Sequence, residues 1–238
     1  MLKRTTTFLE KIHLVTSIGI LRPELRDEIF CQICKQLTNN ENKVSKSRGW
    51  ILLSLCLGCF APSNQFVNYL ISFIKKGPSN YSKYCYVRLK RTLANGARSR
   101  PPSWLELRAA KSNFFLSLPI TFIDGSKETI IADSATTSKE LVDALSRKLN
   151  IAFVDDFTVN IGIYDQMTSL GYNDNHIMDA ISECEQYAKF KTGIHERNAP
   201  WKLFVNRELI INPDLIYYED YLVNNLPITG AEYGETHC

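Results

Sequence analysis

The sequence has no aspartate or glutamate between Asn42 and Leu105, a stretch that holds eleven lysine or arginine residues and a charge of +11. From Glu106 onward, twenty acidic residues outnumber eleven basic ones, so that this part carries a charge of −9. Such an uneven distribution excludes a chain whose charges are evenly mixed. It predicts two electrostatically distinct modules, the first of which has a persistent positive field.

No apolar run is long enough to cross a bilayer. The most apolar stretch, Trp50–Phe60, has eleven residues and is followed closely by Pro62, whereas a spanning helix needs about 20. Residues 1–7 lack the apolar core and the small-residue cleavage site of a secretory signal. We therefore predict a cytoplasmic protein without a transmembrane segment, in which the seven cysteines are reduced.

Catalytic motifs are missing as well. The chain contains no Walker loop, GxGxxG or GxSxG motif. Four histidines are present, none at the spacing of a two-histidine metal site: His13, His176, His195 and His237. Asp179, Glu183 and Glu185 are expected on the outer face of a helix rather than as a paired acid and base. These observations predict no enzyme, no catalytic residue and no cofactor.

Two CxxC pairs are the main alternative to that conclusion. Cys31 and Cys34 are separated from Cys56 and Cys59 by twenty-one residues, and four thiolates can hold a tetrahedral zinc ion. Both pairs, however, lie in apolar helical segments without the turn glycines of a zinc knuckle. Because free cysteine is a common small core residue, we interpret these thiols as core packing and keep a zinc or redox protein as the alternative.

The first half of the chain has the apolar spacing of helices. We predict helices near residues 23–37, 48–60, 63–77 and 83–93, and the second should be central because it is apolar nearly all round. Pro23 suits a first turn, and Asn95-Gly96 suits a helix end. The segment that contains Trp104 and Leu107 is expected to dock on this bundle and to form the domain joint.

The second half has the pattern of a ubiquitin-like β-grasp domain. Asp124-Gly125 is a hairpin turn signal, and Thr137 with Glu140 is a capping box that begins a helix. The expected elements follow in the β-grasp order: hairpin 120–132, helix 137–149, strand 157–163, helix 176–188 and strand 201–205. A last helix is expected within 214–225.

Several long motifs resemble the tail of unconventional myosins. Five of them are similar to the myosin tail homology four domain: Ile20–Pro23, Arg26–Gln32, Arg48–Trp50, Cys59–Pro62 and Pro101–Leu107. Others resemble the first lobe of the adjoining FERM domain, most closely in class VII myosins: Asp133–Thr137, Lys139–Leu141, Met178–Ile181, Cys184–Ala188 and Glu196–Trp201.

The resemblance implies an α+β chain with three parts. Residues 1–112 would be an N-terminally incomplete helical bundle, residues 117–207 the ubiquitin-like first FERM lobe, and residues 208–238 the start of a helical second lobe. The chain would then be a truncated piece of a tail, without the motor that hydrolyses ATP.

The resemblance also implies a noncatalytic, cytoskeleton-associated module that binds cargo or adaptor proteins. The basic run favours acidic protein segments as partners, with microtubules or the myosin's own motor domain as further partners and nucleic acid as the least favoured. The predicted binding surface consists of seven basic residues: Lys75, Lys76, Arg88, Lys90, Arg91, Arg98 and Arg100. Two alternatives remain: a basic face that the acidic second domain neutralises, and a structural or autoinhibitory segment without a partner of its own.

Overall fold

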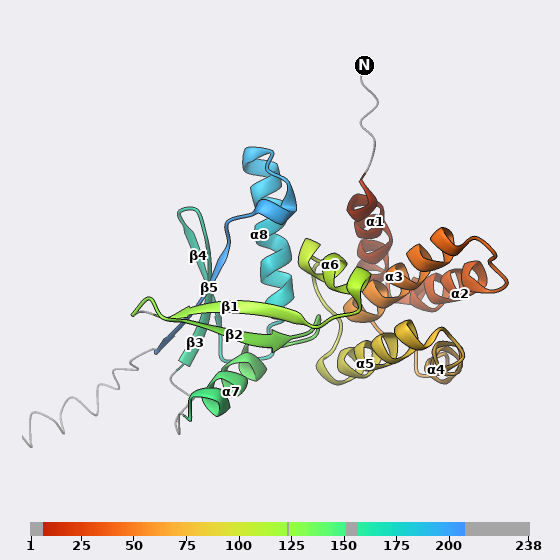
Figure 1. Ribbon diagram of the computed structural model, residues 1–238, viewed down its shortest axis with the longest axis horizontal. Coiled ribbons are helices and arrows are strands. Elements are labelled where there is room, and N and C mark those ends of the chain that lie inside the picture. Colours follow the sequence, from red (N-terminus) through yellow and green to blue (C-terminus); the bar gives the residue numbers. More distant parts are fainter. Residues whose placement is uncertain (1–6, 123, 151–156, 208–238) are drawn as a thin grey trace, which may run out of the picture. The chain divides into compact units, whose positions relative to one another are not determined.

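The computed structural model describes residues 7–122, 124–150 and 157–207 (Figure 1). Its first part, the helical domain, contains the helices α1 Phe8–Leu21, α2 Arg26–Leu37, α3 Lys43–Cys59, α4 Val67–Lys75, α5 Ser79–Asn95 and α6 Trp104–Ser112, with a 3-10 turn at Pro23–Leu25. Its second part, the sheet domain, contains β1 Leu116–Phe122, β2 Lys127–Ala132, α7 Ser138–Leu149, β3 Phe157–Ile163, β4 Gln166–Gly171, α8 Ile177–Thr192 and β5 Lys202–Arg207, with a 3-10 turn at Glu196–Asn198.

The prediction that the second apolar segment forms the central helix is confirmed. Helix α3 packs against α1, α2, α5 and α6, and nearly every residue from Trp50 to Cys59 is buried. The indole of Trp50 stacks between the rings of Phe73 and Tyr81, with ring centroids 5.8 Å away on each side. A Cβ atom at Gly77 would collide with this indole, so the glycine after α4 is required by packing.

The predicted helix ends hold in part. Helix α5 ends at Asn95, and Gly96 adopts a φ of +85°, a conformation that suits glycine. The docked segment at Trp104 proves to be a helix of its own, α6, which begins with a capping box between Ser103 and Glu106. Helix α1 was not predicted individually, although it too begins with a capping box, between Thr7 and Glu10.

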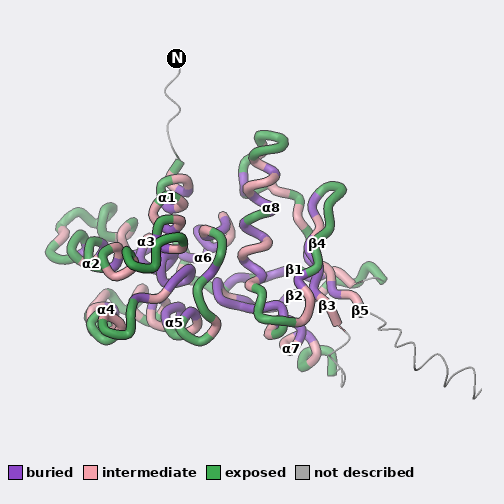
Figure 2. The backbone as a smooth tube through the Cα atoms, turned by 180° about the vertical axis from the view of Figure 1, so that it is seen from behind, coloured by how far each residue is buried: buried purple, intermediate pink, exposed green. Residues whose placement is uncertain are grey.

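The predicted hairpin, helices and strands follow one another along the chain as expected, and the five strands lie in the sheet in the order β2-β1-β5-β3-β4. Strands β1 and β5 are parallel, and the other neighbours are antiparallel. Strand β4, for which no strand was predicted, pairs with β3 across a turn in which Tyr164 adopts a φ of +53°. Helices α7 and α8 both contribute to the core on one face of the sheet, and the buried residues lie along the inner sides of these elements (Figure 2).

Both domains fall within one compact unit that ends at Arg207. The expected helix at 214–225 and the expected part at 208–238 lie outside the described residues. Within the described ranges, no helix has the length and apolar character required to span a membrane.

Candidate partner-binding site

The junction between the two domains is held by a buried arginine. Arg98, on the loop after α5, is only 2% exposed. Its Nη1 donates to Glu106 of α6 and its Nε to Asp179 of α8, each over 2.6 Å. Burial alone would lower the pKa of Arg98, but the two carboxylates outweigh this effect and raise it. The guanidinium therefore stays charged and ties the loop to both domains.

A second arginine crosses the junction at the start of α7. Arg91 on α5 donates to Asp133 over 2.7 Å and to both carboxylate oxygens of Glu140. Glu140, the third residue of α7, also accepts from the backbone N–H of Thr137 in the capping box. The hydrogen bonds from Arg91 and Asn95 and the one within the box outweigh its partial burial and lower the pKa of Glu140 to about 2.

Arg88, one turn before Arg91, is also part of the junction. Its side chain is 4% exposed and donates to the hydroxyl groups of Tyr84 and Ser134. Burial thus removes Arg88 and Arg98 from any exposed surface, and Arg91 is occupied by two carboxylates. For Arg91 and Arg98 the structure has the arrangement of the first alternative, in which acidic groups of the second domain meet the basic run.

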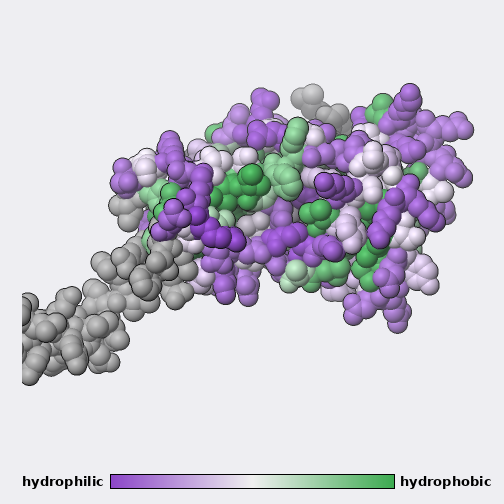
Figure 3. Space-filling view, turned by 60° about the horizontal axis from the view of Figure 1, so that its bottom comes forward, coloured by the Kyte–Doolittle hydropathy of each residue, from purple (hydrophilic) through white to green (hydrophobic). Residues whose placement is uncertain are grey.

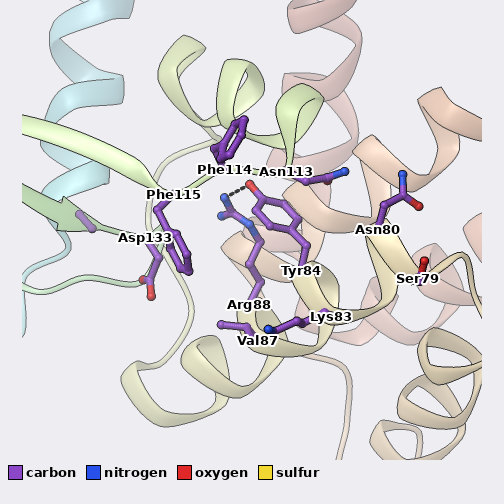
Figure 4. Close-up of a pocket in the computed structure, with 11 residues that line it drawn as sticks. Ser79, Asn80, Lys83, Tyr84, Val87, Arg88, Asn113, Phe114, Phe115 and Asp133 are labelled. Carbon is purple, nitrogen blue, oxygen red and sulfur yellow. Dashed lines mark hydrogen bonds between the residues drawn. The ribbon is translucent and has the colours of Figure 1, made fainter.

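An apolar groove of about 440 Å³ opens beside this junction. It is bounded by α5, the residues that follow α6 and the end of β2 (Figure 4). We call it the interdomain groove; its lining consists of Ser79, Asn80, Lys83, Tyr84, Val87, Arg88, Asn113, Phe114, Phe115, Ala132 and Asp133.

The side chains of the interdomain groove combine apolar surface with a few polar groups. Phe114 is 71% exposed and Phe115 is 67% exposed. Two adjacent aromatic side chains in contact with water form an exposed apolar patch, which is typical of a surface that a partner covers. Lys83 is exposed at the rim. The side-chain oxygen of Asn113 is buried without a hydrogen-bond partner in the structure. On the face that carries α4, α5 and α7, apolar patches lie between hydrophilic side chains (Figure 3).

Comparisons with known proteins identify both domains. Residues 12–109 match the model of the MyTH4 domain, and residues 115–209 match that of the RA like domain. Myosin-VIIa of Drosophila melanogaster is 53% identical over 238 residues, which are 99% of this chain and 11% of the fly protein. The chain is a MyTH4 domain followed by an RA-like lobe, and it is homologous to the tail regions of class VII myosins. We refer to the helical domain as the MyTH4 domain and to the sheet domain as the RA-like lobe.

Two further relatives agree with this assignment. Unconventional myosin heavy chain 6 of Caenorhabditis elegans is 50% identical over 239 residues, covering 98% of this chain and 11% of the worm protein. The structure of the human Myosin 7b C-terminal MyTH4-FERM domain in complex with the harmonin-a PDZ3 domain has a TM-score of 0.76 at 28% identity, covering 88% of this chain and 43% of the human one. The chain spans about a tenth of the curated relatives, contains no motor domain, and is a noncatalytic module.

Four of the seven predicted surface residues are exposed on the MyTH4 domain: Lys75, Lys76, Lys90 and Arg100. The ammonium groups of Lys75 and Lys90 both lie over the ring of Tyr86, 5.6 and 5.2 Å from its centroid. Arg100 is paired with Glu183 of the RA-like lobe over 3.2 Å. The predicted binding surface did not include Lys83. This residue lies seven positions before Lys90 and therefore on the same side of α5.

The expectation of an outward acidic face on α8 is wrong for two of its three residues. Asp179 binds Arg98, and Glu185 is 1% exposed and accepts a hydrogen bond from the backbone N–H of Trp104 over 2.6 Å. Burial raises the pKa of Glu185 to about 8, and the nearby carboxylates of Glu106 and Glu196 add to this effect. Part of the "outer face" of the helix is thus the surface that meets the MyTH4 domain.

The cysteines of the second CxxC pair are core residues. Cys56 and Cys59 are fully buried, while Cys34 is partly buried and Cys31 is exposed. Burial raises the pKa of Cys34 and Cys59 to about 12, which disfavours the thiolate form that binds metals. Across the described ranges, no three His, Cys, Asp or Glu side chains are grouped so as to hold a metal ion.

The groove residues Phe114 and Phe115 were missed by the sequence analysis. A signal was present, because the inward alternation of Leu116, Leu118 and Ile120 places the residue before Leu116 on the other side of the strand. An aromatic residue at that position, next to a second one, indicates an apolar surface outside the core.

Proposed function

We propose that this chain is a cargo- or adaptor-binding module of an actin-based, cytoplasmic unconventional myosin, and that it binds acidic protein segments in the interdomain groove. The module consists of residues 1–112 and 117–207. The observation that carries the proposal is the pair of exposed phenylalanines, Phe114 and Phe115, in a groove rimmed by Lys83. A human relative whose solved structure holds a PDZ domain supports a protein partner.

The charges near the groove favour an acidic segment. Lys75, Lys76, Lys83 and Lys90 form no ion pair with a described carboxylate. We call these four residues the basic face. Asp133, the carboxylate that lines the groove, is paired with Arg91. An incoming acidic segment therefore meets cations whose charge is uncompensated, and its affinity should fall with salt because exposed charges are screened within about 10 Å at 0.1 M.

A displayed library of random peptides, selected on the purified chain, tests the groove. We expect enriched peptides to combine acidic residues with apolar anchors and to lose at least about tenfold in affinity for the double variant Phe115→Ala, Lys83→Glu. The matched control changes the same residue types outside the groove: Phe190→Ala, Lys202→Glu, at two exposed positions. Equal affinity of the peptides for both double variants contradicts the proposal.

Microtubules are a second candidate partner, favoured by the basic face. Two of its lysines share the ring of Tyr86, and α4 and α5 contain no acidic residue. Cosedimentation across a salt series with the variant Lys75→Glu, Lys76→Glu, Lys90→Glu tests it. Arg88 and Arg91 are left unchanged because they hold the domain junction. Binding that the variant retains contradicts a microtubule contact through this face.

The alternative of a structural or autoinhibitory segment, including a contact with the myosin's own motor domain, predicts another outcome. In that case neither peptides nor microtubules bind the folded chain at low salt.

A further inference from the structure

An open strand edge lies next to the interdomain groove. Strand β2 is the first strand in the sheet order, and among the described strands it pairs with β1 alone. On the side of β2 that faces away from β1, every second residue directs its backbone N–H and C=O groups out of the sheet. Such an edge accepts an additional strand unless it is covered or blocked.

The register determines which backbone groups face outward. Phe122 N–H donates to the carbonyl of Ser126 at the hairpin turn, and the pairing of β1 with β2 continues from Thr121–Lys127 without a shift. Hydrogen-bonded pairs therefore recur at every second residue, so the backbone N–H and C=O groups of Glu128 and Ile130 point toward β1. Pro119, which has no N–H, lies opposite Thr129 at a pair that needs no such bond. Thr129 and Ile131 consequently direct their N–H and C=O groups away from the sheet.

The side chain of Lys148 covers part of this edge. The ammonium group of Lys148 donates to the carbonyl of Thr129 over 3.1 Å and pairs with Glu128 over 2.6 Å. This contact independently shows that the Thr129 carbonyl points outward. The N–H and C=O of Ile131 have no hydrogen-bond partner within the described part of the chain, and its side chain is 70% exposed.

The space beside Ile131 continues the interdomain groove. A second cavity of about 300 Å³ lies there, which we call the edge trough; its lining consists of Arg91, Phe115, Ile131, Ala132, Asp133, Thr136, Glu140, Asp143, Ala144 and Arg147. It shares Phe115, Ala132 and Asp133 with the interdomain groove. The two cavities therefore form a path from α5 along the end of β2.

We propose that the partner segment binds in an extended conformation and adds a strand to the outer edge of β2, with its backbone bonded to Ile131 and to the N–H of Thr129. This inference rests on the proposed function and specifies how the segment binds. Alternate side chains would then contact Phe115 and Ile131, while the others are acidic. Arg147 on the trough wall is exposed and belongs to no ion pair among the described residues, so an acidic side chain of the segment should lie beside it. The same wall carries Glu140 and Asp143, from which the acidic side chains should point away.

A proline at position 131 separates backbone pairing from side-chain contact. Because the Ile131 N–H faces outward, Ile131→Pro removes this donor without removing a bond of the native sheet. The matched variant Ile131→Thr keeps the N–H and a branched side chain. For the peptides selected on the wild-type chain, we expect Ile131→Pro to weaken binding at least about tenfold and Ile131→Thr to weaken it much less.

Amide hydrogen exchange measured by NMR on the wild-type chain provides a test that does not depend on the folding of either variant. Strand addition predicts that the Thr129 and Ile131 amides become protected when a selected peptide binds. Unchanged exchange at both amides overturns strand addition and favours a helical peptide in the groove. If those peptides still require Phe115 and Lys83, the proposed function stands; if they do not, the proposed function fails as well.

Discussion

At the scale of single residues, Glu185 combines two opposed effects. Its carboxylate accepts the N–H of Trp104, the first residue of α6, where the helix dipole favours a negative charge. Burial acts in the opposite direction and dominates, so that the pKa rises to about 8. The native protein therefore binds a proton at Glu185 at pH values where the unfolded chain has released it.

Replacing Glu185 by glutamine should change the pH dependence of stability. Between the ordinary pKa of 4.5 and the folded value of about 8, the native state holds the extra proton, so this group lowers the free energy of unfolding as pH rises, by up to about 1.4 kcal/mol per pH unit. Glu185→Gln removes this loss and keeps an acceptor for Trp104. Urea unfolding of both proteins across this range measures the difference.

The difference between the two proteins isolates Glu185 from the histidines. Burial lowers the pKa of His13 and of His176, so these groups make stability fall as pH drops through the range below 6.5. Both proteins contain them equally. Parallel curves for the wild type and Glu185→Gln would show that the carboxyl at 185 does not carry the raised pKa.

At the scale of elements, the capping-box glutamates of two helices are also domain contacts. In the capping box of α1, Glu10 reaches Lys189 of α8 over 2.9 Å. In the capping box of α7, Glu140 binds Arg91 of α5. In each case the glutamate that satisfies an N-terminal backbone N–H also forms an ion pair with the other domain. Local helix geometry and domain docking are therefore coupled through one side chain.

Removing the cap of α7 should cost more than removing a cap that lacks this link. Asn42 caps α3 by accepting from Ser45, and both residues are exposed, so Asn42→Ala should cost about 1 kcal/mol. Thr137→Ala removes the cap of α7 and also leaves Glu140 less well positioned to bind Arg91. We therefore expect it to lower the free energy of unfolding by about 2 kcal/mol. Urea denaturation of the two variants compares these losses. An equal cost would show that the cap and the ion pair act independently.

The sequence predicts elements better than it predicts contacts between them. The Thr137–Glu140 box, the central α3 and the β1–β2 hairpin depend on neighbouring residues, and each is confirmed. Helix α6 and strand β4 were missed because their short segments are stabilised by tertiary contacts rather than by a long periodic pattern. The second lobe and its helix were not tested.

The candidate site was less accessible to prediction than the fold. The charge imbalance correctly indicated two modules, but the pairing of Arg91 with Glu140 and of Arg98 with Asp179 joins residues far apart in the chain. Nothing in the local sequence distinguishes these arginines from Lys90 or Arg100. Only the fold decides which basic residues become buried and which stay exposed.

At the scale of the whole molecule, the junction should make the two domains unfold together. Arg98 is buried between Glu106 and Asp179, and breaking such a pair leaves an uncompensated buried charge at a cost of about 3–5 kcal/mol. We expect Arg98→Met to lower the melting temperature and to split a single calorimetric transition into two. A single transition in the variant would mean that other contacts couple the domains.

The neighbouring Arg100 provides the control for this experiment. Its side chain is half exposed, and its pair with Glu183 is also largely exposed, so Arg100→Met should change stability by less than about 1 kcal/mol. The same substitution type at two nearby positions thus separates the buried pair from a general loss of positive charge.

The charged contacts at Arg91 and Arg98 also affect the rate at which a partner segment associates with the protein. Apolar faces can slide over one another with little change in energy, whereas these bonds are satisfied at a single alignment of the two domains. We therefore expect these bonds to hold the interdomain groove at one width in the free molecule. The rate at which a segment associates should then be governed by diffusion and electrostatic attraction rather than by a slow rearrangement of the two domains.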